Sequence, residues 1–206
     1  MRAAVTLLDA FRYYRDSEFH TDETEERSLA ELIMRIRGER TPQTDAMLRG
    51  IAWHDVCERP TERYMQSTDT YVSGGYEFEA ASAGVILMDL PADRVCEVKM
   101  VEDIGPITVS GIADYLDGVV GGDMKLTKKV EPDKFHDSIQ WKAYCRIADL
   151  EMFRYHVAQP RERNDIVTLH DYKVFTFYRS EKTDRDVEEI CEHFYEFAQP
   201  YLEDAA

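Results

Sequence analysis

The sequence is poor in cysteine and in positive charge, and it has no long apolar run. Its 206 residues include four cysteines, 25 lysine or arginine residues and 41 aspartate or glutamate residues, for a formal net charge of −16. No apolar stretch approaches the roughly 18 residues that a membrane-spanning helix needs, so we expect no membrane partner. The start of the chain is followed quickly by Asp9, Arg12 and Arg15, which is untypical of a signal peptide, and we expect a cytoplasmic protein.

The cysteines are too scattered to form a recognisable zinc or disulfide framework. No C-x-x-C pair begins a zinc site, and an intracellular chain rarely uses disulfides. We interpret the four as buried thiols: Cys57, Cys96, Cys145 and Cys191. The sequence also lacks internal repeats, a low-complexity linker and a Walker motif, which favours one domain without a motor of its own.

Negative charge is unevenly distributed along the chain. A strongly acidic protein is at first sight unsuited to a polyanion such as DNA. The acidic residues concentrate in 21–26 and 181–206, however, and the stretch 118–146 is net-basic because of Lys125, Lys128, Lys129, Lys134, Lys142 and Arg146. A charged run is most often a solvated face, so this asymmetry alone identifies no partner.

Hydrophobic periodicity predicts helices in the first third of the chain and mainly strands later. The predicted helices are 5–14, 28–37 (after an acidic loop at 21–26), 41–58 with Thr41 as N-cap and Pro42 as its first residue, 134–150, and 186–198 ending before Pro200. The predicted strands are 95–101, 107–115, 119–127, 153–159 and 167–178. This order favours an α/β (α+β) domain with a mixed central sheet; residues 71–90 give no clear assignment.

Two carboxylates and a lysine are expected to converge on the second and third of these strands. Asp123 and Lys125 share a face because side chains alternate along a strand. Any even loop length at the following turn keeps Asp114 on that face, and a loop of 117–120 sets it opposite Asp123. Carboxylates are ligands for a hard divalent cation, and a lysine can orient water or steady phosphate charge, as phosphodiester hydrolysis requires. Taken alone, a D-x-K pair is more often a solvated strand face.

Two helical pairs flank this hairpin in the sequence. Gln140 and Tyr144 share one helix face, as do Gly50 and His54. Glycine within a helix costs about 1 kcal/mol relative to alanine, so we expect a packing reason at Gly50. A single histidine such as His54 is more often a hydrogen-bonded structural residue than a metal ligand.

Together these features resemble the motif series of RecB-like nucleases in the PD-(D/E)XK superfamily. The series reads Gly50-x-x-x-His54, Gly111-x-x-Asp114, Asp123-x-Lys125 and Gln140-x-x-x-Tyr144, and it spans about residues 46–146. The resemblance implies a restriction-endonuclease-like core with a mixed sheet flanked by helices. We therefore expect one nuclease domain over residues 1–206, with a helical part (about 1–60) and a nuclease core (about 61–206).

The resemblance also implies roles for individual residues. His54, Asp114, Asp123 and the backbone carbonyl of Met124 would bind Mg²⁺ or Mn²⁺, and Lys125 would serve the attacking water. Asp114, Asp123 and Lys125 would form the catalytic set together with Gln140 and Tyr144, which would contact DNA or support the catalytic strand. We predict DNA contacts from Lys128, Lys129 and Lys142.

The implied activity is a metal-dependent DNA exonuclease in recombination, repair or phage DNA processing. The alternatives are a structure- or sequence-specific endonuclease on the same core, and a catalytically inert module that binds DNA or protein. The size resembles λ-exonuclease-like and CRISPR-adaptation nucleases. The latter carry four cysteines on an iron–sulfur cluster, and the cysteine spacing here differs, so we expect no cluster. A recombinase or annealing protein and a homo-oligomer are further expected partners.

The sequence departs from the motif series at three places. Gly121-Gly122 precedes Asp123 where the family is usually apolar, which would be consistent with a bulge. A second D-x-K pair, Asp171 and Lys173, interrupts an apolar alternation over 167–177, but no Gln-x-x-x-Tyr helix follows it. Glu97 and Glu102 flank the first strand of the meander, each as an extra ligand or as a surface residue.

Overall fold

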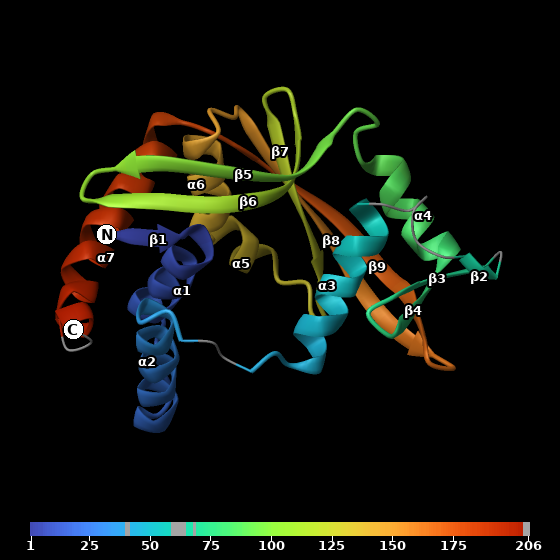
Figure 1. The fold of residues 1–206 in the computed structure, drawn as a ribbon, viewed down its shortest axis with the longest axis horizontal. Coiled ribbons are helices and arrows are strands. Elements are labelled where there is room, and N and C mark those ends of the chain that lie inside the picture. Colours follow the sequence, from blue (N-terminus) through green and yellow to red (C-terminus); the bar gives the residue numbers. More distant parts are fainter. Residues whose placement is uncertain (40–41, 59–64, 68, 204–206) are drawn as a thin grey trace.

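The computed structural model describes residues 1–39, 42–58, 65–67 and 69–203 (Figure 1). Over these residues the strands are β1 (Arg2–Ala4), β2 (Met65–Ser67), β3 (Thr70–Ser73), β4 (Tyr76–Glu79), β5 (Val95–Ile104), β6 (Ile107–Asp117), β7 (Val120–Leu126), β8 (Met152–Arg163) and β9 (Ile166–Tyr178). The helices are α1 (Val5–Asp16), α2 (Asp22–Ile36), α3 (Asp45–Glu58), α4 (Ala80–Asp89), α5 (Pro132–Asp137), α6 (Ile139–Ile147) and α7 (Glu181–Glu203).

The strands form one mixed sheet, as predicted. Its order is β1-β6-β7-β8-β9-β4-β3-β2, with β5 also paired to β6. Three neighbouring pairs are parallel, namely β1 with β6, β7 with β8, and β4 with β9. The long β5–β6 ribbon lies across the sheet between α7 and α4 (Figure 1). The predicted α+β class with a mixed central sheet is therefore confirmed.

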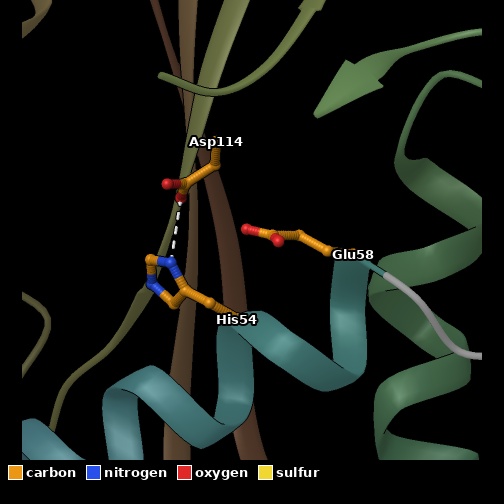
Figure 2. A group of neighbouring side chains, drawn as sticks. All are labelled: His54, Glu58 and Asp114. Carbon is orange, nitrogen blue, oxygen red and sulfur yellow. Dashed lines mark ion pairs between the residues drawn. The ribbon is translucent and has the colours of Figure 1, made fainter. Parts of the chain in front are cut away.

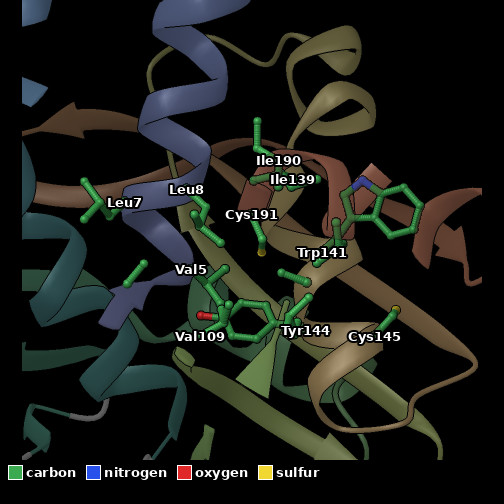
Figure 3. Packing of buried hydrophobic residues seen from close by; sticks show 14 of the residues in the cluster. Val5, Leu7, Leu8, Val109, Ile139, Trp141, Tyr144, Cys145, Ile190 and Cys191 are labelled. Atoms are coloured by element: carbon green, nitrogen blue, oxygen red, sulfur yellow. The ribbon is translucent and has the colours of Figure 1, made fainter. Parts of the chain in front are cut away.

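Two apolar cores lie on the two sides of the sheet. On one side, α1, α6 and α7 contribute buried side chains such as Leu8, Trp141 and Ile190 (Figure 3). On the other side, α3 and α4 contribute buried side chains such as Trp53 and Ile86. The N-terminal helices α1 and α2 thus contribute to the same core as α6 and α7.

Alternation along β8 distributes its side chains between these cores. Phe153, Tyr155 and Val157 face the first core, and Ala158 faces the second. Cys57, Cys145 and Cys191 are buried free thiols as expected, whereas Cys96 is only half-buried. Among the described residues, no helix is both long enough and apolar enough to cross a bilayer.

Helix boundaries differ from the prediction where capping side chains decide them. The acidic segment 21–26 is not a loop: Thr21 caps α2, and the acidic residues occupy its first turn, where they complement the positive end of the helix. Helix α3 begins at Asp45, and the Thr44 hydroxyl accepts the Met47 amide at 3.3 Å. The predicted N-cap Thr41 lies outside the described residues, and Pro42 precedes the helix.

The predicted helix 134–150 is two helices. Ser138 separates α5 from α6, because its hydroxyl caps α6 at the Gln140 amide (3.1 Å) and donates to Asp9 (2.9 Å). Helix α7 begins earlier than predicted and continues through Pro200, which lies in its last turn, so that the helix ends three residues after the missing amide donor. Strand β1 and the elements within 71–90 were not predicted.

Candidate active site

A gap in the pairing of β6 creates the site. One edge of β6 pairs with β5, whereas its other edge pairs with β1 at 108–110 and with β7 only at 115–117. The register Tyr115↔Gly122, continued by one residue, sets Asp114 opposite Asp123, as the sequence predicted. Beyond that point, the Asp114 carboxylate accepts the Met124 amide at 2.6 Å. A side chain thus holds β7 where the two strands diverge.

Helix α3 brings two further ligand-type side chains to Asp114. His54 Nδ1 lies 3.4 Å from Asp114 Oδ2, and Glu58 lies one helical turn further along α3. Figure 2 shows both side chains directed at Asp114, and one ligand atom from each of the three lies within 4.8 Å of the others. Glu58 was not predicted, although its i, i+4 spacing from His54 would have indicated a shared helix face.

Asp123 and Lys125 share a face, as the strand alternation predicted. Lys125 Nζ lies 2.5 Å from Asp123 Oδ2, and the Asp123 side chain is only 4% exposed. This contact is a charge pair at hydrogen-bonding distance, and the Asp123 charge helps to raise the pKa of Lys125. Lys125 also lies over the Tyr155 ring at 6.0 Å, and one third of its side chain (33%) is exposed.

Burial and like charge perturb the acids of this site. Burial, reinforced by the Asp114 charge, raises the pKa of Asp123 to about 6. Burial would also raise the pKa of Asp114, but the hydrogen bond and charge of His54 outweigh it and lower that pKa. Burial and then the charges of Glu97 and Asp114 raise the pKa of Glu58 to about 7. The site therefore concentrates negative charge that a bound cation would relieve.

The donor set fits a divalent cation. Carboxylate oxygens and one imidazole suit Mg²⁺ or Mn²⁺, and no thiol belongs to the described group.

Tyr144 and Gly111 have a structural explanation. The Tyr144 hydroxyl donates at 2.7 Å to the carbonyl of Ile112, which lies between the residues of β6 that pair with β1 and those that pair with β7. A Cβ at Gly111 would lie 2.5 Å from the Tyr144 ring, so only glycine permits this approach. Gln140 is buried on the same helix, and burial raises the pKa of Tyr144 to about 12. Tyr144 thus supports the strand that carries Asp114.

The two glycines before Asp123 lie in a regular strand, so the suspected bulge is wrong. A Cβ at Gly122 would overlap the ring of its cross-strand partner Tyr115, and a Cβ at Gly121 would lie 2.5 Å from Leu150. The expected packing reason at Gly50 is absent, since a Cβ there would meet no described atom within 4 Å.

The second D-x-K pair lies in a different environment. A register shift opposite Gln159 and Pro160 breaks the alternation of β9, so residues 167–177 do not form the predicted continuous stripe. Asp171 and Lys173 form an exposed pair at 3.2 Å. Val157 of β8 lies between the two lysines, since it pairs with Lys125 on β7 and with Lys173 on β9, so both lysines belong to one cross-strand row. No second carboxylate was predicted beside Lys173.

The two candidate extra ligands, Glu97 and Glu102, differ in their position relative to Asp114. Glu102 pairs with Arg146 at 3.0 Å and lies five residues beyond Glu97 on β5, away from Asp114. Glu97 lies opposite Asp114 between paired residues of β5 and β6, has a left-handed φ of 51°, and acts on Glu58 through its charge.

The predicted DNA contacts do not all lie near Lys125. Lys129 lines the same cleft as Lys125, although it pairs with Glu131 at 2.5 Å. Lys128 belongs to the same loop, after β7. Lys142 pairs with Asp186 of α7 at 2.7 Å and lines a separate groove, so the structure does not bring it to the site. A DNA contact from these lysines stays a prediction.

A cleft of about 590 Å³ continues from the site towards the N-terminal helices. Lys125 and Gln140 line one side, and Arg12 of α1 and Arg35 of α2 line the other. Arg35 donates to the Thr6 carbonyl at 2.8 Å, and the buried Arg12 Nε has no hydrogen-bond partner among the described residues. The cleft therefore presents cationic groups on both sides.

Comparison with known proteins identifies the fold. No protein-family profile matches the sequence, and no curated protein matches it. The alkaline exonuclease LHK-Exo from Laribacter hongkongensis superposes with a TM-score of 0.55 and 14% identity, over 99% of this chain and 91% of its own. A phage-related exonuclease from Haemophilus somnus 129PT gives 0.59 and 7%, over 100% and 97%. The chain therefore has the fold of alkaline and phage-related exonucleases, which confirms the fold implied by the resemblance to RecB-like PD-(D/E)XK nucleases.

Proposed function

We propose that this protein is a divalent-metal-dependent nuclease that hydrolyses phosphodiester bonds of DNA and acts as an exonuclease. The observation that carries the proposal is the convergence of Asp114, Asp123 and Lys125 at the gap between β6 and β7, beside His54. A module that only bound DNA would gain nothing from buried carboxylates near phosphate, because like charges repel. This argues against the catalytically inert alternative.

The residues that would hold the cation are His54, Asp114, Asp123 and the Met124 carbonyl. A bound Mg²⁺ or Mn²⁺ would polarise the phosphoryl oxygen and lower the pKa of water at neutral pH. Asp114 has a second task, since its carboxylate accepts the Met124 amide and so fixes the backbone of β7 at the site. Asp114 would therefore both bind the cation and position the Met124 backbone beside it.

Lys125 is placed to act on the attacking water or on the phosphate. The charges of Asp123 and Asp114 outweigh the burial that would lower the pKa of Lys125, and its pKa lies above the usual value. The side chain is therefore an ammonium group at neutral pH. As a cation beside the scissile phosphate, it would orient water and steady the developing negative charge.

The cleft supports a DNA substrate. Its lining by Lys125, Arg12 and Arg35 offers cations to a phosphate backbone in an otherwise acidic protein. One neighbour in fold, LHK-Exo, was solved in complex with dAMP, a mononucleotide of the class that an exonuclease releases. A role in recombination, repair or phage DNA processing is part of this proposal, as are a recombinase or annealing partner and a homo-oligomer.

End-labelled linear DNA and covalently closed circular DNA, each with and without Mn²⁺, test the proposal. We expect release of nucleotides from linear DNA only with Mg²⁺ or Mn²⁺, loss of activity in EDTA, and survival of the closed circles. Rapid linearisation of a supercoiled plasmid would instead favour an endonuclease. Full activity in excess chelator would refute the metal requirement, and no cleavage of either substrate would favour the inert module.

A further inference from the structure

We propose that Glu58 is a direct ligand of the divalent cation, so that the cation lies between His54, Glu58 and Asp114, on the α3 side of Asp114. This inference rests on the proposed function. The motif series contains no counterpart of Glu58, and its implied ligand set is His54, Asp114, Asp123 and the Met124 carbonyl. The inference therefore adds a ligand that the resemblance does not supply.

The geometry of the three side chains fits one ion. Oxygen and nitrogen ligands about 2.0–2.6 Å from a cation lie up to about 5 Å from one another. One ligand atom each of His54, Glu58 and Asp114 lies within 4.8 Å of the other two. His54 and Glu58 extend from successive turns of α3 towards the Asp114 carboxylate (Figure 2). A cation could therefore be bound with little movement of the backbone.

Helix α3 is held firmly at the end that carries these ligands. Arg94 donates to the Cys57 carbonyl at 3.0 Å, which satisfies a free carbonyl at the helix C-terminus. Ser73 of β3 donates to Asp55 at 2.7 Å, and Val56 and Cys57 are fully buried. The face that bears His54 and Glu58 is thus fixed against β6, as a preorganised metal site requires.

The charges around Glu58 point to the same position. Its carboxylate is repelled by Glu97 and Asp114, and His54 is the neighbour that attracts it. Asp123 already has a cationic partner on the other side of Asp114, since Lys125 Nζ lies 2.5 Å from its Oδ2. A cation on the α3 side of Asp114 would relieve the repulsion that Glu97 and Asp114 exert on the Glu58 carboxylate.

Mn²⁺ binding to the full chain, measured by calorimetry and by electron paramagnetic resonance without DNA, tests this inference. Changes to residues that merely support a metal site already alter affinity by about 10- to 100-fold. We expect Glu58→Gln to weaken Mn²⁺ binding by at least about tenfold. The matched control is Asp55→Asn, which removes one charge from the same helix at a carboxylate that accepts from Ser73. It should change affinity by less than about threefold.

A second variant separates ligation from charge. Glu58→Asp keeps the charge but withdraws the carboxylate by one methylene. If Glu58 is a direct ligand, this variant should bind Mn²⁺ more weakly than the wild type. If Glu58 acts only through its charge, the affinity should not change. Glu58→Asp also decides the matter if Glu58→Gln fails to fold, which melting in EDTA reveals. Equal Mn²⁺ affinity in wild type, Glu58→Asp and any folded Glu58→Gln would overturn the inference while the nuclease proposal stands. Absence of Mn²⁺ binding and of cleavage in the wild type would overturn both.

Discussion

The two D-x-K pairs of this chain share a local sequence pattern but differ in every physical property that a metal site requires. Asp123 is buried beside a second carboxylate, and its pKa is raised to about 6, first by burial and then by Asp114. Asp171 is exposed, and its hydrogen bond with Lys173 lowers its pKa. The difference comes from the neighbouring strands: β6 diverges from β7 at Asp114, whereas β9 stays paired with β8 on either side of its bulge. A site depends on what the fold places around the pattern.

The largest expected effect is the difference in the rate of DNA hydrolysis between alanine variants of the two lysines. Lys125→Ala should lower the rate of DNA hydrolysis by about 100-fold or more, as for other groups that orient or activate water. Lys173→Ala should change the rate little, although Lys173 lies in the same cross-strand row. Single-turnover hydrolysis by both variants at equal folded fraction measures this. Inactivity of Lys173→Ala beside an active Lys125→Ala would move the site to β9.

His54→Ala sharpens the comparison, because no histidine from a helix was predicted beside the second pair, Asp171 and Lys173. We expect about a tenfold or greater loss of Mn²⁺ affinity with an unchanged melting temperature in EDTA, since His54 is only half-buried. Melting and turnover on the same preparation distinguish a ligand from a core residue. A lowered melting temperature with normal specific activity of the folded fraction would make His54 structural.

Gly122→Ala tests why two glycines precede Asp123 on β7. The added Cβ would overlap the Tyr115 ring. The hydroxyl of Tyr115 forms a hydrogen bond with His156 Nε2 at 2.8 Å, so the ring cannot move freely. We expect a loss of about 1–3 kcal/mol in the free energy of unfolding, as for other overpacked cores. Gly50→Ala is the control, since the space there is open, and it should stabilise or leave stability unchanged. Urea unfolding of both variants measures the difference.

The strands β5 to β9 were predictable, because alternation and turn residues are local properties. The even register between β6 and β7 followed from Asp117-Gly118, and it placed Asp114 opposite Asp123. The contribution of Glu58 was not predicted, because it depends on where α3 lies over the gap. The division of the helix at Ser138 was missed for a similar reason: Asp9, 129 residues away, accepts from that serine. Pairings of this range leave no periodic signal in the sequence.

A smaller effect is expected from pH. The pKa of Asp123 in the folded protein lies near 6, above its ordinary value, so the folded state favours its protonated form. In EDTA, its contribution to stability should therefore fall as pH rises from about 4 to about 6, and then level off. Mn²⁺ requires the carboxylate, so affinity should rise over the same range. Calorimetry at several pH values tests both signs, with Asp123→Asn as the variant whose stability in EDTA should no longer fall between about pH 4 and 6.

The central claim is that the gap between β6 and β7 is the place of catalysis. Mn²⁺-dependent degradation of end-labelled linear DNA by Asp114→Asn and by Asp171→Asn tests it most directly, with melting in EDTA to confirm that both are folded. We predict that Asp114→Asn is inactive at every Mn²⁺ concentration and that Asp171→Asn matches the wild type. An active, folded Asp114→Asn, or an inactive, folded Asp171→Asn, would contradict the claim.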